Sequence, residues 1–133
     1  MRLSNYKEDM IKQEAGSPCY VGEGFFLVRR FGTDESNKQV ENIKRDLYGF
    51  APKDIDGDLV LAHWLCDYGV TGWDGVLDED DEPLKYTAMN ARLVFMNPAF
   101  FKSINAMLTS HASNYASYLY DEVVEDVENI KKS

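Results

Sequence analysis

The residues best suited to chemistry are two cysteines and two histidines, of which only His63 and Cys66 lie close together in the chain. Their three-residue spacing puts them on the same face of a helix. A cysteine–histidine nucleophile pair needs an accessible thiolate in positive surroundings, whereas this segment is apolar on nearly every side. We therefore interpret His63 as a core histidine. His111, which interrupts an apolar stripe, is interpreted in the same way.

The other potential metal ligands are arranged unfavourably for a metal site. Cys19 and Cys66 are 47 positions apart, and with two lone histidines they fit neither a disulfide framework nor a zinc site. Asp78, Asp80 and Glu82 begin like a calcium-binding loop, which needs glycine at its sixth position and glutamate at its twelfth. Those positions hold proline and methionine, and the acidic run over 54–58 fails the same test. We expect a solvated acidic loop, no catalytic residues, no cofactor and no metal.

Length and charge restrict the class of protein further. The 133 residues suit one domain, and the 14 basic and 23 acidic side chains give a net charge of −9. Such a charge disfavours binding to nucleic acid and to anionic membranes. No apolar run approaches the roughly 20 residues of a membrane span, and the charged residues 1–14 do not resemble a signal peptide. We therefore expect a cytosolic protein with reduced thiols.

The pattern of apolar residues predicts a mainly α fold with a small N-terminal β-hairpin. Glycines at positions 22 and 24 suit the turn of that hairpin, and apolar residues recur at helical spacing in the rest of the chain. We expect a single compact helical domain that ends in a long C-terminal helix, with a break near residues 110–113 as the alternative. The predicted elements within this domain, 1–133, are a hairpin over 18–31 and helices over 34–48, 53–68, 88–95 and 98–130.

Both faces of the predicted hairpin are apolar where its second strand begins. Strand alternation puts Phe25 and Leu27 on one face and Phe26 and Val28 on the other. A two-stranded hairpin cannot hide both faces against one helical layer, so a neighbouring molecule could pack there, unless residues 1–14 cover it. The predicted interaction surface adds three positions of the last helix to these four, namely Tyr118, Val123 and Val127.

The end of that last helix allows two interpretations. Its segment over 121–128 contains five acidic residues among three valines. Acidic residues near a helix C-terminus oppose the macrodipole, which favours an exposed arm. The alternative is a helix docked on its own domain.

The order of the segments is more distinctive than any single residue. Leu27-Val-Arg-Arg-Phe-Gly-Thr33 is followed by Gly72-Trp-Asp-Gly-Val-Leu-Asp-Glu-Asp-Asp-Glu-Pro-Leu-Lys-Tyr-Thr87 and then by Asn97-Pro-Ala-Phe100. Over residues 1–125 this order resembles the tail assembly chaperones of long-tailed bacteriophages, small proteins encoded upstream of the tape measure protein. Asp81 departs from the pattern, which has glycine in this turn. Within the strongest stretch we expect a structural motif formed by Trp73, Asp74, Gly75, Pro83 and Tyr86, with Trp73 packed on the preceding helix.

The resemblance implies a protein without catalytic activity. Members of the family self-associate and bind the tape measure protein, with tail tube subunits as a further partner. They act in the host cytoplasm and are absent from the mature virion. The resemblance thus implies a homo-oligomer, and the acidic charge leads us to expect that it binds neither nucleic acid nor membrane. Two other interpretations stay open: a small cytosolic adaptor or regulatory binding protein, and an enzyme or small-ligand binder that uses His63, Cys66 and the carboxylates.

Overall fold

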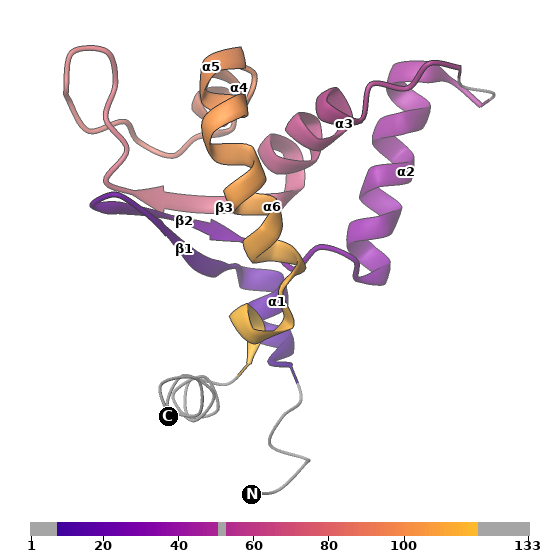
Figure 1. The fold of residues 1–133 in the computed structure, drawn as a ribbon, viewed down its shortest axis with the longest axis horizontal. Helices are drawn as coiled ribbons and strands as arrows, with labels where there is room; N and C mark the ends of the chain where they lie inside the picture. Colours follow the sequence, from indigo (N-terminus) through magenta and orange to yellow (C-terminus); the bar gives the residue numbers. More distant parts are fainter. Residues whose placement is uncertain (1–7, 51–52, 120–133) are drawn as a thin grey trace, which may run out of the picture.

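A computed structural model describes residues 8–50 and 53–119, which form a three-stranded antiparallel sheet with helices packed against it (Figure 1). The strands are β1 (Ser17–Val21), β2 (Gly24–Val28) and β3 (Val70–Asp74), in the order β1-β2-β3. The predicted mainly α fold with an isolated hairpin was wrong, because β3 pairs with β2 and makes the fold a mixed α and β one. The hairpin itself spans Ser17 to Val28, so it begins one residue before the predicted range of 18–31 and ends three residues before its end.

The register of the sheet separates its side chains into two sets. Cys19, Phe26 and Trp73 lie opposite one another across the three strands and face the helices. On the other side the register aligns Tyr20 with Phe25, and Pro18 with Leu27. We call these four residues the outer sheet face.

The helices begin where the sequence provides capping side chains. Thr33 caps α2 (Asp34–Tyr48) and Thr87 caps α4 (Ala88–Phe95), so both helices have their predicted bounds. The predicted helix over 53–68 begins later. Asp54 has a positive φ of 54°, and Asp56 caps α3 (Gly57–Trp64), which continues as a π-helical turn, η2 (Leu65–Gly69). A short α1 (Met10–Ala15) precedes the sheet.

The predicted long C-terminal helix over 98–130 was also wrong. The chain forms α5 (Pro98–Phe100), a π-helical turn η3 (Phe101–Asn105) and α6 (Ala106–Ser113), and then leaves the helix at Asn114. The side chain of Asn114 accepts a hydrogen bond from the N–H of Ala116 and caps a 3₁₀ turn, η4 (Tyr115–Tyr118). Asparagine favours such caps over helix interiors. Val123, Val127 and the acidic segment lie outside the described residues.

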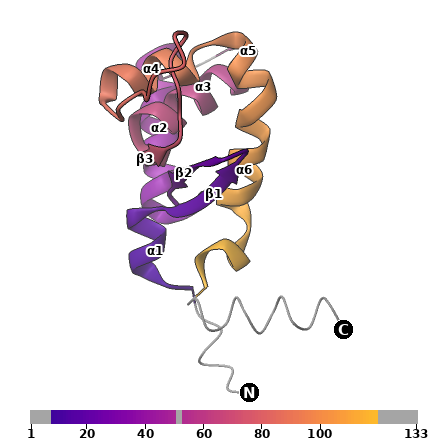
Figure 2. The same ribbon diagram turned by 90° about the vertical axis from the view of Figure 1, so that its left-hand side faces the viewer.

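The core lies between the sheet and the helices. Phe26 of β2 packs its ring against those of Trp73, Phe95 and Phe100, and α6 crosses the sheet (Figure 1). Figure 2 shows α3, α4 and α5 at one end of the molecule and α1 and the end of the described chain at the other.

Candidate functional site

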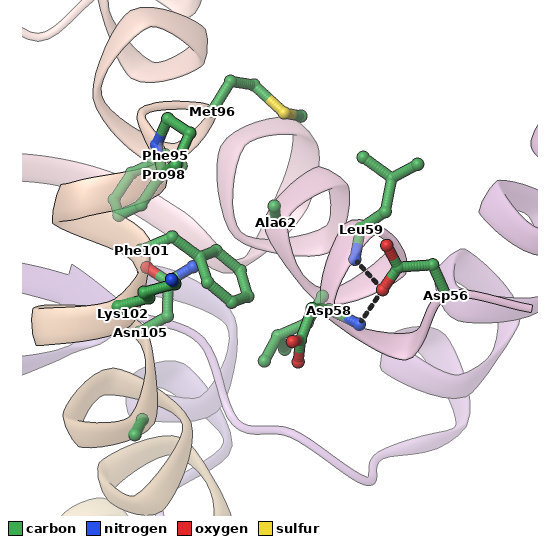
Figure 3. Close-up of a pocket in the computed structure, with 12 residues that line it drawn as sticks. Asp56, Asp58, Leu59, Ala62, Phe95, Met96, Pro98, Phe101, Lys102 and Asn105 are labelled. Carbon is green, nitrogen blue, oxygen red and sulfur yellow. Dashed lines mark hydrogen bonds between the residues drawn. The ribbon is translucent and has the colours of Figure 1, made fainter.

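An apolar groove of about 500 Å³ lies between α3 and the segment from the end of α4 to α6 (Figure 3). Leu59, Leu61 and Ala62 form the α3 wall. Phe101 and neighbouring residues of α4, α5 and η3 form the opposite wall. A groove of this size can take a small molecule or part of a peptide. We call it the α3–α6 groove.

Side-chain caps fix the start of both walls. The Asp56 carboxylate accepts hydrogen bonds from the N–H groups of Asp58, at 3.0 Å, and Leu59, at 3.3 Å, and so begins α3. Asn97 does the same for α5, and Pro98 occupies the first helical position, where its missing N–H costs nothing. Capping side chains thus set where α3 and α5, one helix in each wall, begin.

One of the buried residues that line this groove is polar. Asn105 is 1% exposed, and within the described part of the chain neither its amide nitrogen nor its amide oxygen has a hydrogen-bond partner. Its main-chain oxygen accepts a hydrogen bond from Thr109 Oγ1 at 2.7 Å. A buried polar group without a partner costs about 1–3 kcal/mol. This wall of the groove therefore contains a buried donor and a buried acceptor without a partner among the described residues.

Three charged side chains line the groove. Asp56 and Asp58 lie at the start of α3, and Lys102 lies on the opposite wall. Because the Asp56 carboxylate caps the helix, Asp58 is the carboxylate available to an approaching partner. The charge at the groove is slightly negative, like that of the whole chain.

The other side of α3 is also apolar and loosely filled. A second hollow of about 300 Å³ lies between α2 and α3, lined by Val40, Ile55 and Trp64 among others. Trp64 is fully buried, and its indole N–H has no acceptor among the described residues. Two residues beyond the end of α2, Phe50 is 92% exposed. The α2–α3 end of the molecule thus presents apolar surface that its own fold does not bury.

The structure brings His63, Cys66 and Asp67 together, with one ligand atom of each within 4.8 Å of the others. Sequence reasoning missed Asp67, although its four-residue spacing from His63 could have revealed it. His63 Nδ1 lies 3.6 Å from Asp67 Oδ2, and the Cys66 thiol donates to Asp67 Oδ1 at 3.5 Å. Arg92 Nη2 contacts the same Oδ1 at 3.0 Å.

The surroundings of this cluster are unfavourable for nucleophilic chemistry. Burial, with a smaller contribution from the Asp67 carboxylate, raises the pKa of the Cys66 thiol to about 12. The thiol is therefore protonated at neutral pH, whereas a nucleophilic cysteine needs a lowered pKa. The Arg92 guanidinium also compensates the Asp67 charge that would attract a cation. We interpret the cluster as a polar connection between η2 and α4.

His111 has hydrogen-bond partners at both ring nitrogens. Nε2 lies 3.1 Å from Ser17 Oγ, and Nδ1 lies 3.3 Å from Ser117 Oγ. Burial lowers the pKa of this histidine. Its contacts are thus those of a core histidine that joins α6 to β1 and η4.

The structure divides the predicted interaction surface. Phe26 and Val28 are buried in the core because the helices cover that side of the sheet. Tyr118 is fully buried too, and its hydroxyl donates to the main-chain oxygen of Val28 at 2.6 Å. Phe25 and Leu27 are only partly buried and belong to the outer sheet face. Of the five residues of the predicted interaction surface that the structure describes, only Phe25 and Leu27 are accessible to a partner.

The predicted structural motif joins β3 to the acidic loop. Trp73 Nε1 donates to the main-chain oxygen of Leu84 at 2.7 Å, and the Trp73 ring packs edge-on against Tyr86 at 5.0 Å. The Tyr86 hydroxyl donates to Val70 O at 2.8 Å. The ring partners of Trp73 lie on β2, α4 and the following loop, rather than on the preceding helix where we expected them; they are Phe26, Tyr86 and Phe95.

The turns of this motif depend on unusual backbone angles. Gly75 has a φ of 76°, and a Cβ there would lie 2.7 Å from the Cα of Gly24. The acidic loop closes through an antiparallel bridge between Leu77 and Pro83, and Asp74 at the end of β3 is exposed. Asp81, in place of the expected glycine, has a φ of 60°, which aspartate tolerates better than most residues.

The comparisons with known proteins add no information to this geometry. No protein-family model, curated protein or solved structure matches the chain. Among the described residues, no helix is both long enough and apolar enough to cross a bilayer.

Proposed function

We propose that this chain is a non-catalytic assembly chaperone of the phage-tail type, which holds an apolar segment of a partner protein in the α3–α6 groove. The observation that carries the proposal is the groove itself, because it combines apolar walls with a buried amide that lacks a partner in the described part of the chain. Large exposed apolar patches mark binding sites, and the second hollow adds apolar surface on the other side of α3.

The identity of the partner rests on the resemblance in sequence. It points to the tape measure protein as the segment held in the groove, and to tail tube subunits as a further partner. We also propose that the chain acts in the host cytoplasm, leaves before the virion is mature, and self-associates through the outer sheet face. There Tyr20 is 71% exposed, and its ring contacts that of Phe25 at 5.7 Å.

Affinity capture with two matched variants tests the proposal. Leu59 lines the groove and Met89 lies outside it, both in the first turn of a helix. An aspartate there suits the helix macrodipole, so Leu59→Asp and Met89→Asp should both fold. We expect the parent chain and Met89→Asp to retain the co-expressed tape measure protein of the same genome, and Leu59→Asp to lose it. If both variants retained the tape measure protein equally, the groove would not be its binding site. If the parent chain did not retain it, the proposed function would be wrong.

An adaptor or regulatory protein is the second candidate and would use the same groove. The two candidates differ in the partner that it retains. Capture of the tape measure protein supports the chaperone. Specific capture, sensitive to Leu59→Asp, of a partner outside the tail supports the adaptor.

A further inference from the structure

We propose that the α3–α6 groove recognises its partner through the main chain, by pairing the Asn105 side chain with the N–H and C=O of one residue in an extended, apolar segment. This inference rests on the proposed function and specifies the conformation of the held segment. A primary amide offers one acceptor and two donors, and at Asn105 all of them lack a partner among the described residues. A ligand that suits this side chain must supply both a donor and an acceptor on the same edge.

An extended peptide meets that requirement, whereas a helix does not. In an extended strand the N–H and C=O of a residue project toward the same neighbouring chain, as in the paired positions of an antiparallel ladder. Within a helix both groups are already paired with the helix itself, and only the terminal turns leave them free. The buried amide of Asn105 therefore favours an extended segment over a folded helical one.

The walls of the groove suit the side chains of such a segment. Alternate side chains of a strand project to opposite sides, and the groove presents apolar surface on two sides. Leu59 and Ala62 lie on one side, and Phe95 and Phe101 lie on the other (Figure 3). A residue that pairs with Asn105 can thus place apolar neighbours against either wall. Main-chain pairing would supply affinity without demanding one particular sequence.

Access to Asn105 requires a local adjustment that the fold allows. Both amide atoms are shielded from solvent in the empty groove, and the partly buried Phe101 lies on the same wall. Asn105 and Phe101 are the two ends of the π-helical turn η3. Such turns interrupt regular helical hydrogen bonding and occur frequently at functional sites. The proposal requires this turn to adjust locally, for example through the Phe101 rotamer, so that the amide opens to the groove.

Charge indicates a neutral or basic segment of another protein as the occupant. The groove carries Asp58 and Asp56 against a single Lys102, and the chain as a whole carries −9. Residues 120–133 of this chain hold five acidic residues, which the same charges disfavour. The described chain also ends at Leu119, at the end of the molecule opposite α3 (Figure 2). We therefore assign the groove to a partner rather than to this chain's own C-terminal segment.

Peptide probes that differ only in main-chain donors test the proposal. The first is a fluorescein-labelled nonapeptide of alternating leucine and threonine between terminal lysines. Its twin is N-methylated at the central leucine, which removes one N–H. A third peptide of equal charge is held helical by aminoisobutyrate. With the full chain we expect the first probe to bind about tenfold more tightly than its twin, since each hydrogen bond contributes a modest net free energy. The helical probe should bind more weakly than the first.

The Asn105→Leu variant provides the decisive comparison. It removes the buried amide and keeps a side chain of similar size, so it should melt at the same or a higher temperature than the parent chain. We expect it to bind the first probe and its methylated twin with equal affinity. An equal penalty for N-methylation in both proteins would overturn the proposal. Tighter binding of the helical probe, or no binding of the first probe by the parent chain, would do the same.

A measurement on the parent chain keeps the proposal testable even if the Asn105→Leu variant does not fold. In the proton–nitrogen NMR spectrum, the side-chain NH₂ signals of Asn105 should shift when the first probe is added, and should shift less at the same concentration of the methylated twin. Asn105 side-chain signals that shift with neither probe would overturn the proposal. If the tape measure protein is retained equally by Asn105→Leu and the parent chain, main-chain recognition fails while the proposed function stands. If the probes behave as expected and no tape measure protein is retained, the proposed function fails instead.

Discussion

The Cys66 thiol lies among packed side chains beside the Asp67 carboxylate, and both surroundings keep it protonated. With its pKa raised to about 12, its alkylation by iodoacetamide should be slow at pH 8 and should accelerate with each step toward pH 11. A Cys19→Ser background isolates Cys66, and the same protein in urea provides the rate of an unperturbed thiol. Rapid modification of the folded chain at pH 8 would show that the thiol is accessible and ionised.

His111 is a second buried titratable residue, and its charged form is a cation, whereas that of Cys66 is an anion. Burial lowers its pKa below the ordinary value of 6.5, so on acidification the unfolded chain binds a proton before the folded chain does. The free energy of unfolding should therefore decrease as the pH falls below about 6.5. His111→Gln should be less stable at pH 7 and should vary less between pH 7 and pH 5. Thermal melts across this range provide the measurement, and parallel curves for both proteins would contradict the assignment.

Asn105 and Asp67 differ in whether the sequence alone could have revealed their roles. Asp67 shares a helix face with His63, and that spacing was visible in the chain. Asn105 interrupts the apolar positions Ile104 and Leu108, yet nothing in the sequence shows that its amide would lack partners. That property depends on the distance between α3 and α6, which only the packed fold defines. The groove therefore could not be predicted from local patterns.

The elements that could be predicted are those with local signals. Capping threonines at 33 and 87 fixed the starts of α2 and α4. Strand β3 gave no comparable signal, because its five residues include Gly72 and it depends on pairing with β2. Strand preference depends on such context. In the C-terminal region the apolar stripe indicated one helix, but the side chain of Asn114 caps a new turn there.

The loop between β3 and α4 depends on Trp73, which allows a graded test. Trp73→Phe keeps the ring packing and loses the hydrogen bond to Leu84 O, so it should cost about 1 kcal/mol. Trp73→Ala also loses the contacts with Phe26, Tyr86 and Phe95 and should cost about 3 kcal/mol. Urea denaturation measures both. Equal costs for the two variants would mean that the ring packing contributes little.

Self-association involves the entire molecule and can be tested at its outer sheet face. Tyr20→Asp puts a charge at an exposed position of that face, and Tyr115→Asp puts the same charge on a tyrosine of η4 outside it. Light scattering over a concentration series should show oligomers for the parent chain and Tyr115→Asp, and a monomer for Tyr20→Asp. Because each copy carries −9, added salt should strengthen the association by screening repulsion. A parent chain that stays monomeric at all concentrations would rule it out.

The central claim is that the α3–α6 groove holds the partner, and a photo-crosslinker placed in the groove tests it most directly. Benzoylphenylalanine in place of the groove residue Leu59 should crosslink to the co-expressed tape measure protein on illumination. The same group in place of Met89, which is 74% exposed outside the groove, should not. Mass spectrometry of the crosslinked peptide would then identify the held segment. Crosslinking from position 89 alone, or equally from both positions, would contradict the account.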